Sequence, residues 1–286
     1  MLRLLLRVSR PYYWLVTLWL YLLPTGGRLE LLPTLPFCIG LIYCTMPLNA
    51  MCYLMNDLSD VIVDADNPRK GGELLGAKED ESKLRAAIVP TALLQLPFLL
   101  TFHWLFGAVT WPWFAAVFSV NWMYNFGPRF SGNFAPLDLA CPCGYILVTP
   151  LSCWLNAIPY PPARSWAHAV LLVLRTQLWI QTFDIDCDAA AGRRNTAVRL
   201  GLRNSQYLLA LMLLGETAFV HAHFDHWPLR SLSSGSLALL AAQMLLTSSQ
   251  GPGSSVSPQT INRTFLVLGL GGVGLLARVW IDAAFA

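Results

Sequence analysis

Charged side chains are scarce in this sequence. Asp, Glu, Lys and Arg together make up 12% of the 286 residues, whereas 55% are hydrophobic, and the mean hydropathy is +0.51. Because a soluble domain carries about 25% charged residues, this composition excludes an ordinary soluble protein and predicts an integral membrane protein. The net charge is only +3 and the basic residues are scattered, so we expect no nucleic-acid partner.

Several common functional signatures are missing as well. The sequence contains no Ser-His-Asp arrangement, no glycine-rich phosphate loop and no zinc-ligand pattern. The seven cysteines lie mostly within apolar runs, which favours buried thiols that pack as small hydrophobic side chains. The apolar run after Arg10 is not followed by a convincing small-residue cleavage site, so we predict a first membrane helix there and not a signal peptide.

Long apolar runs are what the sequence has in abundance. A helix that crosses a bilayer needs roughly 17–25 predominantly apolar residues, and nine such segments lie near 8–25, 33–56, 86–106, 108–125, 136–157, 166–184, 205–224, 232–249 and 264–284. Turn residues separate several of them, for example between Pro24 and Gly27 and between Pro159 and Pro162. The sequence therefore predicts an all-α integral membrane protein with about nine transmembrane helices, forming a single domain over residues 1–286.

The basic residues are distributed unevenly between the predicted loops. If the N-terminus is cytosolic, the outer loops hold only Arg28, Arg164 and Arg230, and the other basic loop residues lie inside. This satisfies the positive-inside rule and predicts that the C-terminus lies on the opposite side of the membrane. Two long inner loops, about 56–85 and 184–204, carry seven of the sixteen acidic residues at their mouths, namely Asp57, Asp60, Asp64, Asp66, Asp184, Asp186 and Asp188. Since both loops lie on one side, we expect the two acidic sets to face each other.

The first loop opens with Asn56-Asp57-Leu58-Ser59-Asp60-Val61-Ile62-Val63-Asp64. On a helix, Asp57, Asp60 and Asp64 share one face because they stand at i, i+3 and i+7, and Asn49 and Tyr53 continue that face backwards. Three carboxylates on one face repel each other unless a cation lies between them, and Mg²⁺ is the natural cation for oxygen ligands beside phosphate. The alternative is a helix end whose acids are simply solvated.

The second acidic set stands at Asp184 and Asp188, which are i and i+4 on one helix face, with Asp186 pointing elsewhere. Gln177 and Gln181 extend this face into the membrane. Basic pairs follow both acidic sets, at Arg69-Lys70 and Arg193-Arg194. Acids that hold Mg²⁺ beside bases that bind the remaining oxygens suit a metal-bridged diphosphate, although positive-inside topology alone also explains part of the basic set.

These motifs resemble a known family. Asn56-Asp57-x-x-Asp60-x-x-x-Asp64 is similar to the first signature of the UbiA superfamily of intramembrane prenyltransferases, and Asp184-x-x-x-Asp188 with the run Ala191 to Gly201 resembles its second. Ser9-Arg10-Pro11 resembles the family's motif before its first helix, and Tyr124-Asn125-x-x-Pro128-Arg129 with Pro136-Leu137-Asp138 resembles its middle loop. The resemblance covers about residues 9–204 by motif. Where the family's middle loop has a lysine, this chain has Ser131-Gly132-Asn133. The run Asn67-Pro68-Arg69-Lys70-Gly71-Gly72 looks more like the lycopene elongase-like, carotenoid-prenylating group.

The resemblance implies nine helices around a central cavity that opens to lipid and is capped by the two acidic loops. It implies one Mg²⁺ held by Asp57, Asp60 and Asp64 with Asn56, and a second held by Asp184 and Asp188. The diphosphate of an allylic prenyl donor would lie between the metals, with its chain in the cavity. The candidate catalytic residues are these five aspartates, and the candidate substrate-binding residues are Asn49, Tyr53, Asn56, Arg69, Lys70, Tyr124, Arg129, Gln177, Gln181, Arg193 and Arg194.

Other polar and aromatic residues remain open to two interpretations. Arg175 and Glu216 fall inside predicted helices, where they either pair with each other or line an acceptor pocket. Aromatic side chains near the cavity mouth, namely Tyr53, Trp122, Tyr124, Tyr145 and Trp179, either belong to the interfacial belt or stabilise a carbocation.

The function expected is Mg²⁺-dependent transfer of a prenyl group from its diphosphate to a lipophilic acceptor, aromatic or isoprenoid. A terpene cyclase of the same family, which ionises the same donor but quenches the cation internally, is one alternative. A non-catalytic transporter or scaffold is another, but a transport path predicts acids across the membrane, whereas here they gather on one side.

Overall fold

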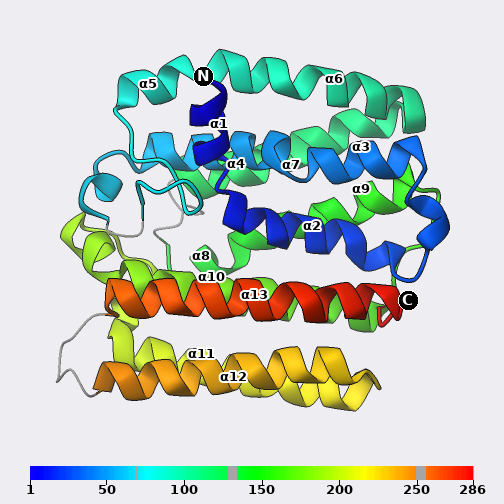
Figure 1. The fold of residues 1–286 in the computed structure, drawn as a ribbon. Helices are drawn as coiled ribbons and strands as arrows, with labels where there is room; N and C mark the ends of the chain where they lie inside the picture. Colours follow the sequence, from blue (N-terminus) through cyan, green and yellow to red (C-terminus); the bar gives the residue numbers. More distant parts are fainter. Residues whose placement is uncertain (68–69, 128–133, 249–255, 286) are drawn as a thin grey trace.

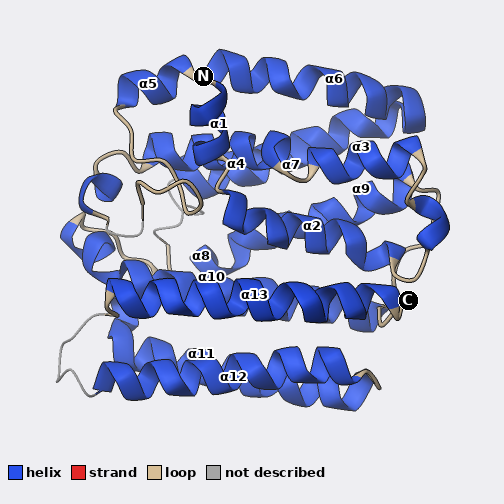
Figure 2. Ribbon diagram, viewed as in Figure 1, coloured by secondary structure: helices blue, strands red, loops and turns tan. Residues whose placement is uncertain are grey.

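The structure is a computed structural model that describes residues 1–67, 70–127, 134–248 and 256–285. Within these ranges the regular elements are all helices (Figure 2). The long helices lie side by side with their axes running in one general direction (Figure 1), so the ends of the helices form two opposite faces of the bundle. The fold class predicted from the sequence is confirmed.

Nine membrane-length segments of the described residues correspond to the nine predicted from the sequence. In chain order they are α2 (Trp14–Leu22) with its flanking 3₁₀ turns, α3 (Leu35–Tyr43) with α4 (Met46–Ser59), α6 (Ile88–Phe106), α7 (Thr110–Phe126), α8 (Leu137–Ala140) with η6 (Cys141–Leu147) and α9 (Val148–Leu155), α10 (Ala163–Ala190), α11 (Thr196–His223), α12 (Trp227–Ser248) and α13 (Pro258–Ile281).

Length and composition alone identify five candidate membrane-crossing stretches in the described residues, Leu35–Ser59, Glu81–Phe126, Leu137–Leu155, Trp227–Ser248 and Gln259–Ile281. The stretch Glu81–Phe126 contains both α6 and α7. The segments outside these stretches are α2, which is short and flanked by 3₁₀ turns, and α10 and α11, which carry charged side chains in their sequences.

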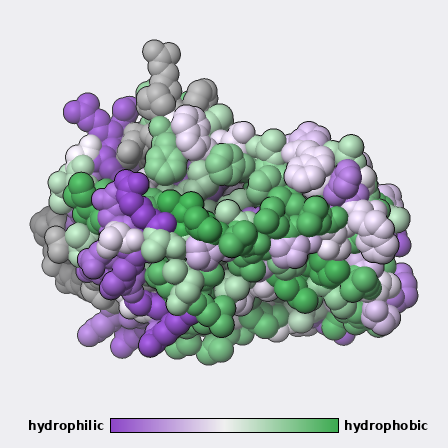
Figure 3. All heavy atoms as spheres, turned by 90° about the horizontal axis from the view of Figure 1, so that it is seen from above, coloured by the Kyte–Doolittle hydropathy of each residue, from purple (hydrophilic) through white to green (hydrophobic). Residues whose placement is uncertain are grey.

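The outer surface of the bundle is strongly apolar. Exposed leucines and a tryptophan run along α6 at Leu93, Leu96, Leu100 and Trp104, and α11 and α13 carry similar exposed side chains. The most hydrophilic residues gather over one end of the molecule, beside a broad apolar surface (Figure 3). A surface of this kind is stable against lipid and not against water, so the protein is an integral membrane protein.

A break separates α3 from α4. Pro47 lies in the first turn of α4 and cannot donate a backbone hydrogen bond, so the helix cannot continue smoothly from Tyr43. The buried Asn49 Nδ2 donates to the carbonyls of Cys44 at 3.0 Å and Thr45 at 2.8 Å, and to Thr17 Oγ1 at 2.9 Å. The side chain of Asn49 thus adds hydrogen bonds to two carbonyls at the break and ties α4 to Thr17 of α2.

The helix that carries the first acidic motif ends earlier than the sequence predicted. α4 stops at Ser59, and Asp64 lies in the separate 3₁₀ turn η4 (Val63–Asp66). Ser59 Oγ donates to the carbonyl of Asn56 at 2.9 Å, and such local side-chain bonds to the backbone compete with helix continuation. The β-branched run Val61-Ile62-Val63 also disfavours a helix. The three aspartates therefore do not share one continuous helix face.

Short elements gather with the acidic loop at one end of the bundle. They are α1 (Leu2–Val8), η1 (Pro11–Tyr13) and α5 (Glu81–Ala86) (Figure 1). Arg7 Nη1 lies 2.6 Å from Glu79 Oε1 and its Nη2 donates to the carbonyl of Gly71, while Leu5 and Leu84 belong to one small apolar cluster. These contacts fix the loop after α4 over the bundle end.

Candidate active site

One cavity of about 360 Å³ runs through the interior of the bundle. Its wall includes residues of α10 from His168 to Asp188, a distance of roughly 30 Å along the helix axis at about 1.5 Å per residue. Other parts of the wall come from α2, α4, α7, η6, α11, α12 and α13. The acidic motifs line one end of this cavity.

The first motif contributes Asn56, Asp60 and Asp64 to the cavity wall, and these residues are spaced four positions apart. Asp57 is not among the described lining residues. It is buried, and its Oδ1 accepts from Arg10 Nη2 at 2.5 Å and from Lys70 Nζ at 2.8 Å. Asp57 therefore contacts two cationic side chains at the site, and its expected role as a metal ligand stays a prediction.

The second motif contributes Asp184 and Asp188, both within α10 as predicted. Asn195 Nδ2 donates to Asp188 Oδ2 at 2.6 Å, and Arg193 Nη1 lies 3.5 Å from Asp188 Oδ1. Asp186 is exposed and is not among the described lining residues, so its predicted orientation away from Asp184 and Asp188 is confirmed.

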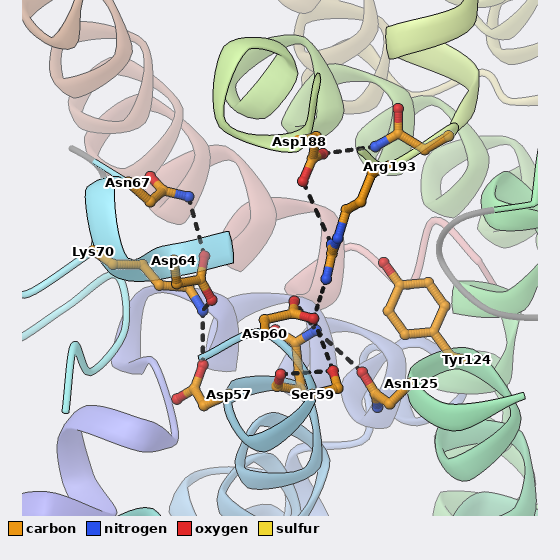
Figure 4. Close-up of polar contacts among 12 residues, drawn as sticks. Asp57, Ser59, Asp60, Asp64, Asn67, Lys70, Tyr124, Asn125, Asp188 and Arg193 are labelled. Atoms are coloured by element: carbon orange, nitrogen blue, oxygen red, sulfur yellow. Dashed lines mark hydrogen bonds and ion pairs between the residues drawn. The ribbon is translucent and has the colours of Figure 1, made fainter. Parts of the chain in front are cut away.

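The two motifs meet across the cavity (Figure 4). Arg193 Nη2 also pairs with Asp60 Oδ1, so this guanidinium joins the first motif to the second. On the other side, Asn67 Nδ2 donates to Asp64 Oδ1 at 3.3 Å and to Asp184 Oδ1 at 3.2 Å. The expectation that the two acidic sets face each other is confirmed.

The electrostatics of the site favour bound cations. Burial leaves the Asp188 carboxyl poorly solvated, 3.5 Å from the Arg193 guanidinium. Burial also disfavours the charged Arg193 guanidinium, but Asp60 and Asp188 outweigh it and raise its pKa. These carboxylates are poorly solvated and therefore gain from a neighbouring positive charge.

The oxygen ligands that line the cavity fit Mg²⁺. Asn56, Asp60, Asp64, Asp184 and Asp188 offer the carboxylate and amide oxygens that this cation prefers beside phosphate and water. Within the described ranges, no three acidic, histidine or cysteine side chains already converge as an assembled metal site. The reason is visible in Figure 4, where Lys70 Nζ contacts Asp64 and Arg193 contacts Asp60. The aspartates that would bind Mg²⁺ are therefore present, and in this structure the side chains of Lys70 and Arg193 lie between them.

Aromatic and amide side chains line the wall next to the acids. Tyr53 and Tyr124 both face the cavity; the Arg10 guanidinium lies 4.4 Å from the Tyr53 ring centroid, and Gln177 Nε2 donates to the Tyr124 hydroxyl at 3.1 Å. Tyr145 and Trp179 also line the cavity, whereas Trp122 is 48% exposed and absent from the described wall. Trp122 thus lies where a lipid-facing belt residue would.

Three predicted substrate-binding residues have other surroundings. Asn49 caps the break before α4 and is not among the described lining residues, and Arg194 is exposed and likewise absent from them. Gln181 lines the cavity, but its amide donates to Asp138 Oδ2 at 2.7 Å and accepts from Ala197 N at 3.3 Å. Asn49 and Gln181 therefore hold helices together. Arg69 and Arg129 lie outside the described residues.

The sequence analysis overlooked the site roles of Arg10, Asn67 and Asn195. Arg10 lines the cavity and bonds both Asn56 Oδ1 and Asp57; the motif Ser9-Arg10-Pro11 singled it out in the sequence, but only the fold shows these partners. The amides of Asn67 and Asn195 stand beside quoted motif residues, but only the fold shows that they donate to aspartates.

Comparison with known proteins agrees with this geometry. The UbiA prenyltransferase family matches residues 13–258. Lycopene elongase/hydratase of Haloarcula japonica is 30% identical over 232 residues, covering 78% of this chain and 75% of the relative. The protein of the same name from Halobacterium salinarum is 27% identical and covers 77% of this chain and 79% of the relative.

The fold is also found among solved structures. A UbiA homolog from Archaeoglobus fulgidus bound to GPP and Mg²⁺ superposes with a TM-score of 0.67 at 19% identity, covering 98% of both chains. The same homolog bound to DMAPP and Mg²⁺ gives a TM-score of 0.66, also at 19% identity, over 96% of this chain and 98% of that chain. This similarity establishes the shared fold. Because the family match spans most of the chain and a relative at 30% identity covers 78% of it, the chain belongs to the UbiA prenyltransferase family and is an enzyme of that type.

Proposed function

We propose that this enzyme binds an allylic prenyl diphosphate at the acidic end of its cavity, with Mg²⁺, and transfers the prenyl group to a lipophilic acceptor. The observation that carries the proposal is the convergence of two acidic motifs, with Lys70 and Arg193 between them, at one end of a largely apolar cavity. The solved homolog with this fold binds GPP or DMAPP together with Mg²⁺, which supports the choice of donor and metal.

We assign the metal ligands to the residues that line the cavity. Asn56, Asp60 and Asp64 would hold Mg²⁺ on one side, and Asp184 and Asp188 on the other. The bound Mg²⁺ would supply positive charge to stabilise the leaving diphosphate. Asp57 supports this end indirectly because it bonds Arg10 and Lys70.

Lys70 and Arg193 complete the diphosphate site in this proposal. Each is bound to cavity aspartates in the structure, and each carries donors suited to diphosphate oxygens. With Mg²⁺ bound to the aspartates, the ammonium and guanidinium groups would be available to the diphosphate. They then stabilise the negative charge that develops as the allylic C–O bond breaks.

The wall beyond the acids protects the resulting carbocation. Tyr53, Tyr124 and Tyr145 present aromatic side chains to the cavity next to the charged end, and ring faces stabilise a nearby cation. Apolar neighbours such as Val120 and Phe265 help to exclude water, which would otherwise quench the cation. An acceptor carbon then attacks the cation and loses a proton.

We propose an isoprenoid acceptor in preference to an aromatic one. The relatives reported above are named lycopene elongase/hydratase, as the run from Asn67 to Gly72 suggested. Their names include no cyclisation, so the terpene-cyclase alternative gains no support. The family assignment weighs against a transporter or scaffold. We further propose that the acidic end and N-terminus face the cytosol and that the C-terminus lies across the membrane, because the basic residues concentrate at the acidic end.

The site assignment is tested with matched aspartate variants in detergent-purified protein. Asp60→Asn and Asp184→Asn each remove a cavity carboxylate, whereas Asp186→Asn removes an exposed carboxylate two residues from Asp184. Mg²⁺-dependent diphosphate release from geranyl diphosphate should fall about 100-fold or more in the first two variants and stay close to wild type in the third. Equal activity in all three folded variants would rule out the proposed site.

A further inference from the structure

A second charged cluster lies inside the cavity, away from the acidic end. Arg175 Nε donates to Glu216 Oε2 at 2.7 Å, and His168 Nδ1 lies 3.8 Å from Glu216 Oε1. Glu216 is 1% exposed and His168 is 3% exposed, yet both line the cavity together with Arg175. Among the described residues, His168 Nδ1 has no hydrogen-bond partner. Of the two alternatives left open by the sequence, the pairing of Arg175 with Glu216 is confirmed, and both residues also line the cavity.

Burying this charged cluster at membrane depth costs free energy. Charges at membrane depth are rare and mark substrate paths or paired functional groups. Ser233 and Ser236 of α12 line the same cavity, but their hydroxyls bond carbonyls of their own helix and do not reach the charges in the structure. The ion pair is therefore a second charged part of the cavity wall, separate from the acidic end.

The distance along α10 between the ion pair and the acidic end shows which part of a bound prenyl donor the pair would contact. Arg175 precedes Asp184 by nine residues, which is roughly 14 Å at about 1.5 Å per residue. The allylic carbon is attached directly to the diphosphate oxygen, so bond breaking occurs at the Asp184 end. The ion pair is too far away to act on the reacting atoms, and it faces the tail of the donor.

We infer that the Arg175–Glu216 ion pair sets the upper length of the donor's hydrocarbon chain. The inference rests on the proposed function, which places the diphosphate at the acids and the chain along the cavity. A dimethylallyl or geranyl chain ends before it reaches the pair. A farnesyl chain extends one isoprene unit further and places its apolar tail against the charged pair, to which it offers no hydrogen bond. The enzyme should therefore discriminate sharply between ten-carbon and fifteen-carbon donors.

The wild-type enzyme provides the first test. Mg²⁺-dependent diphosphate release is measured with dimethylallyl, geranyl, farnesyl and geranylgeranyl diphosphates in the presence of lycopene as acceptor. We expect kcat/KM to fall at least about tenfold between geranyl and farnesyl diphosphate, more than an apolar pocket imposes on a chain it can accommodate. A wild-type enzyme that uses farnesyl and geranylgeranyl diphosphates as well as geranyl diphosphate overturns the inference, whatever the variants do.

The second test removes both charges together. In Arg175→Met/Glu216→Leu the pair is replaced by apolar side chains, a change that is often neutral for stability, whereas removing one partner leaves a buried charge. The ratio of kcat/KM for farnesyl to that for geranyl diphosphate should rise at least about tenfold. Leu172→Ala is the matched control, because it enlarges the described wall on the same helix without touching the pair, and its ratio should stay at the wild-type value.

The outcomes separate this inference from the proposed function. No release from any donor by folded wild-type enzyme contradicts the proposed function itself. Release from short donors, with an unchanged ratio in the folded double variant, leaves the function standing and overturns the chain-length role. An equal rise in Leu172→Ala also overturns it, because space and not charge would then set the limit.

Discussion

Arg193 and Asp60 lie 133 positions apart in the sequence and form an ion pair inside the cavity. Asp60 closes α4, and Arg193 follows the end of α10. Because Arg193 also approaches Asp188, one guanidinium connects the two acidic motifs and stands where a diphosphate between them would need a positive charge.

Arg193→Gln should remove this charge while keeping hydrogen-bonding capacity. We expect kcat/KM for Mg²⁺-dependent diphosphate release from geranyl diphosphate to fall about 100- to 1,000-fold, since a donor to developing negative charge is lost. Mg²⁺ alone should bind more tightly to the variant, because the guanidinium no longer competes for Asp60 and Asp188. Calorimetric titration with MgCl₂ measures this second effect.

Arg194→Gln is the control for this experiment. Arg194 is exposed and absent from the described cavity wall, so its removal should leave both measurements near wild type. If the two variants lose activity equally, Arg193 has no special position between the motifs.

Asp57→Asn tests the reassignment of Asp57 from metal ligand to anchor. Arg10 and Lys70 both lose their charged partner in a buried site, so the free energy of unfolding should fall by about 3 kcal/mol. The melting temperature should drop, but Mg²⁺ with geranyl diphosphate should still raise it, as in wild type.

Asp60→Asn provides the contrast, because its carboxylate lines the cavity. This variant should lose most of the ligand-induced rise in melting temperature. A loss of that rise in Asp57→Asn as complete as in Asp60→Asn would restore Asp57 to the metal-ligand set.

Asn49→Ala tests the structural role given to Asn49. Its amide bonds two carbonyls at the break between α3 and α4 and the Thr17 hydroxyl, and each buried hydrogen bond that is lost costs about 0.5–1.5 kcal/mol. The melting temperature should fall, whereas KM for geranyl diphosphate should not change. Thr17→Val, which removes a hydroxyl from the same network, should show the same pattern. A raised KM at unchanged stability would instead return Asn49 to the substrate site.

The sequence was sufficient where a feature depends on composition or on spacing within one helix. Apolar length located the nine spans, and the i, i+4 spacing correctly placed Asp184 and Asp188 together on α10. The same reasoning was wrong for Asp57, Asp60 and Asp64, because α4 ends at Ser59 and a 3₁₀ turn changes the direction of the chain.

Contacts between distant segments were beyond the sequence. Nothing in the residues around Arg10 indicates that it bonds Asn56 and Asp57, and nothing around Arg194 distinguishes it from Arg193. Such pairings depend on how α1, α4 and α10 pack at one end of the bundle. Likewise, Arg175 and Glu216 could be named as buried charges from hydropathy, but only the fold shows that they are partners in the cavity wall.

The central claim is that the acidic end of the cavity ionises an allylic diphosphate with Mg²⁺. The most direct measurement is diphosphate release from geranyl diphosphate by purified wild-type enzyme, with Mg²⁺ or with EDTA, in the presence and absence of lycopene. The account predicts release with Mg²⁺ that EDTA abolishes, and a prenylated product in the organic phase when lycopene is added. Release that persists in EDTA, or no release by folded enzyme with any short donor, would contradict it.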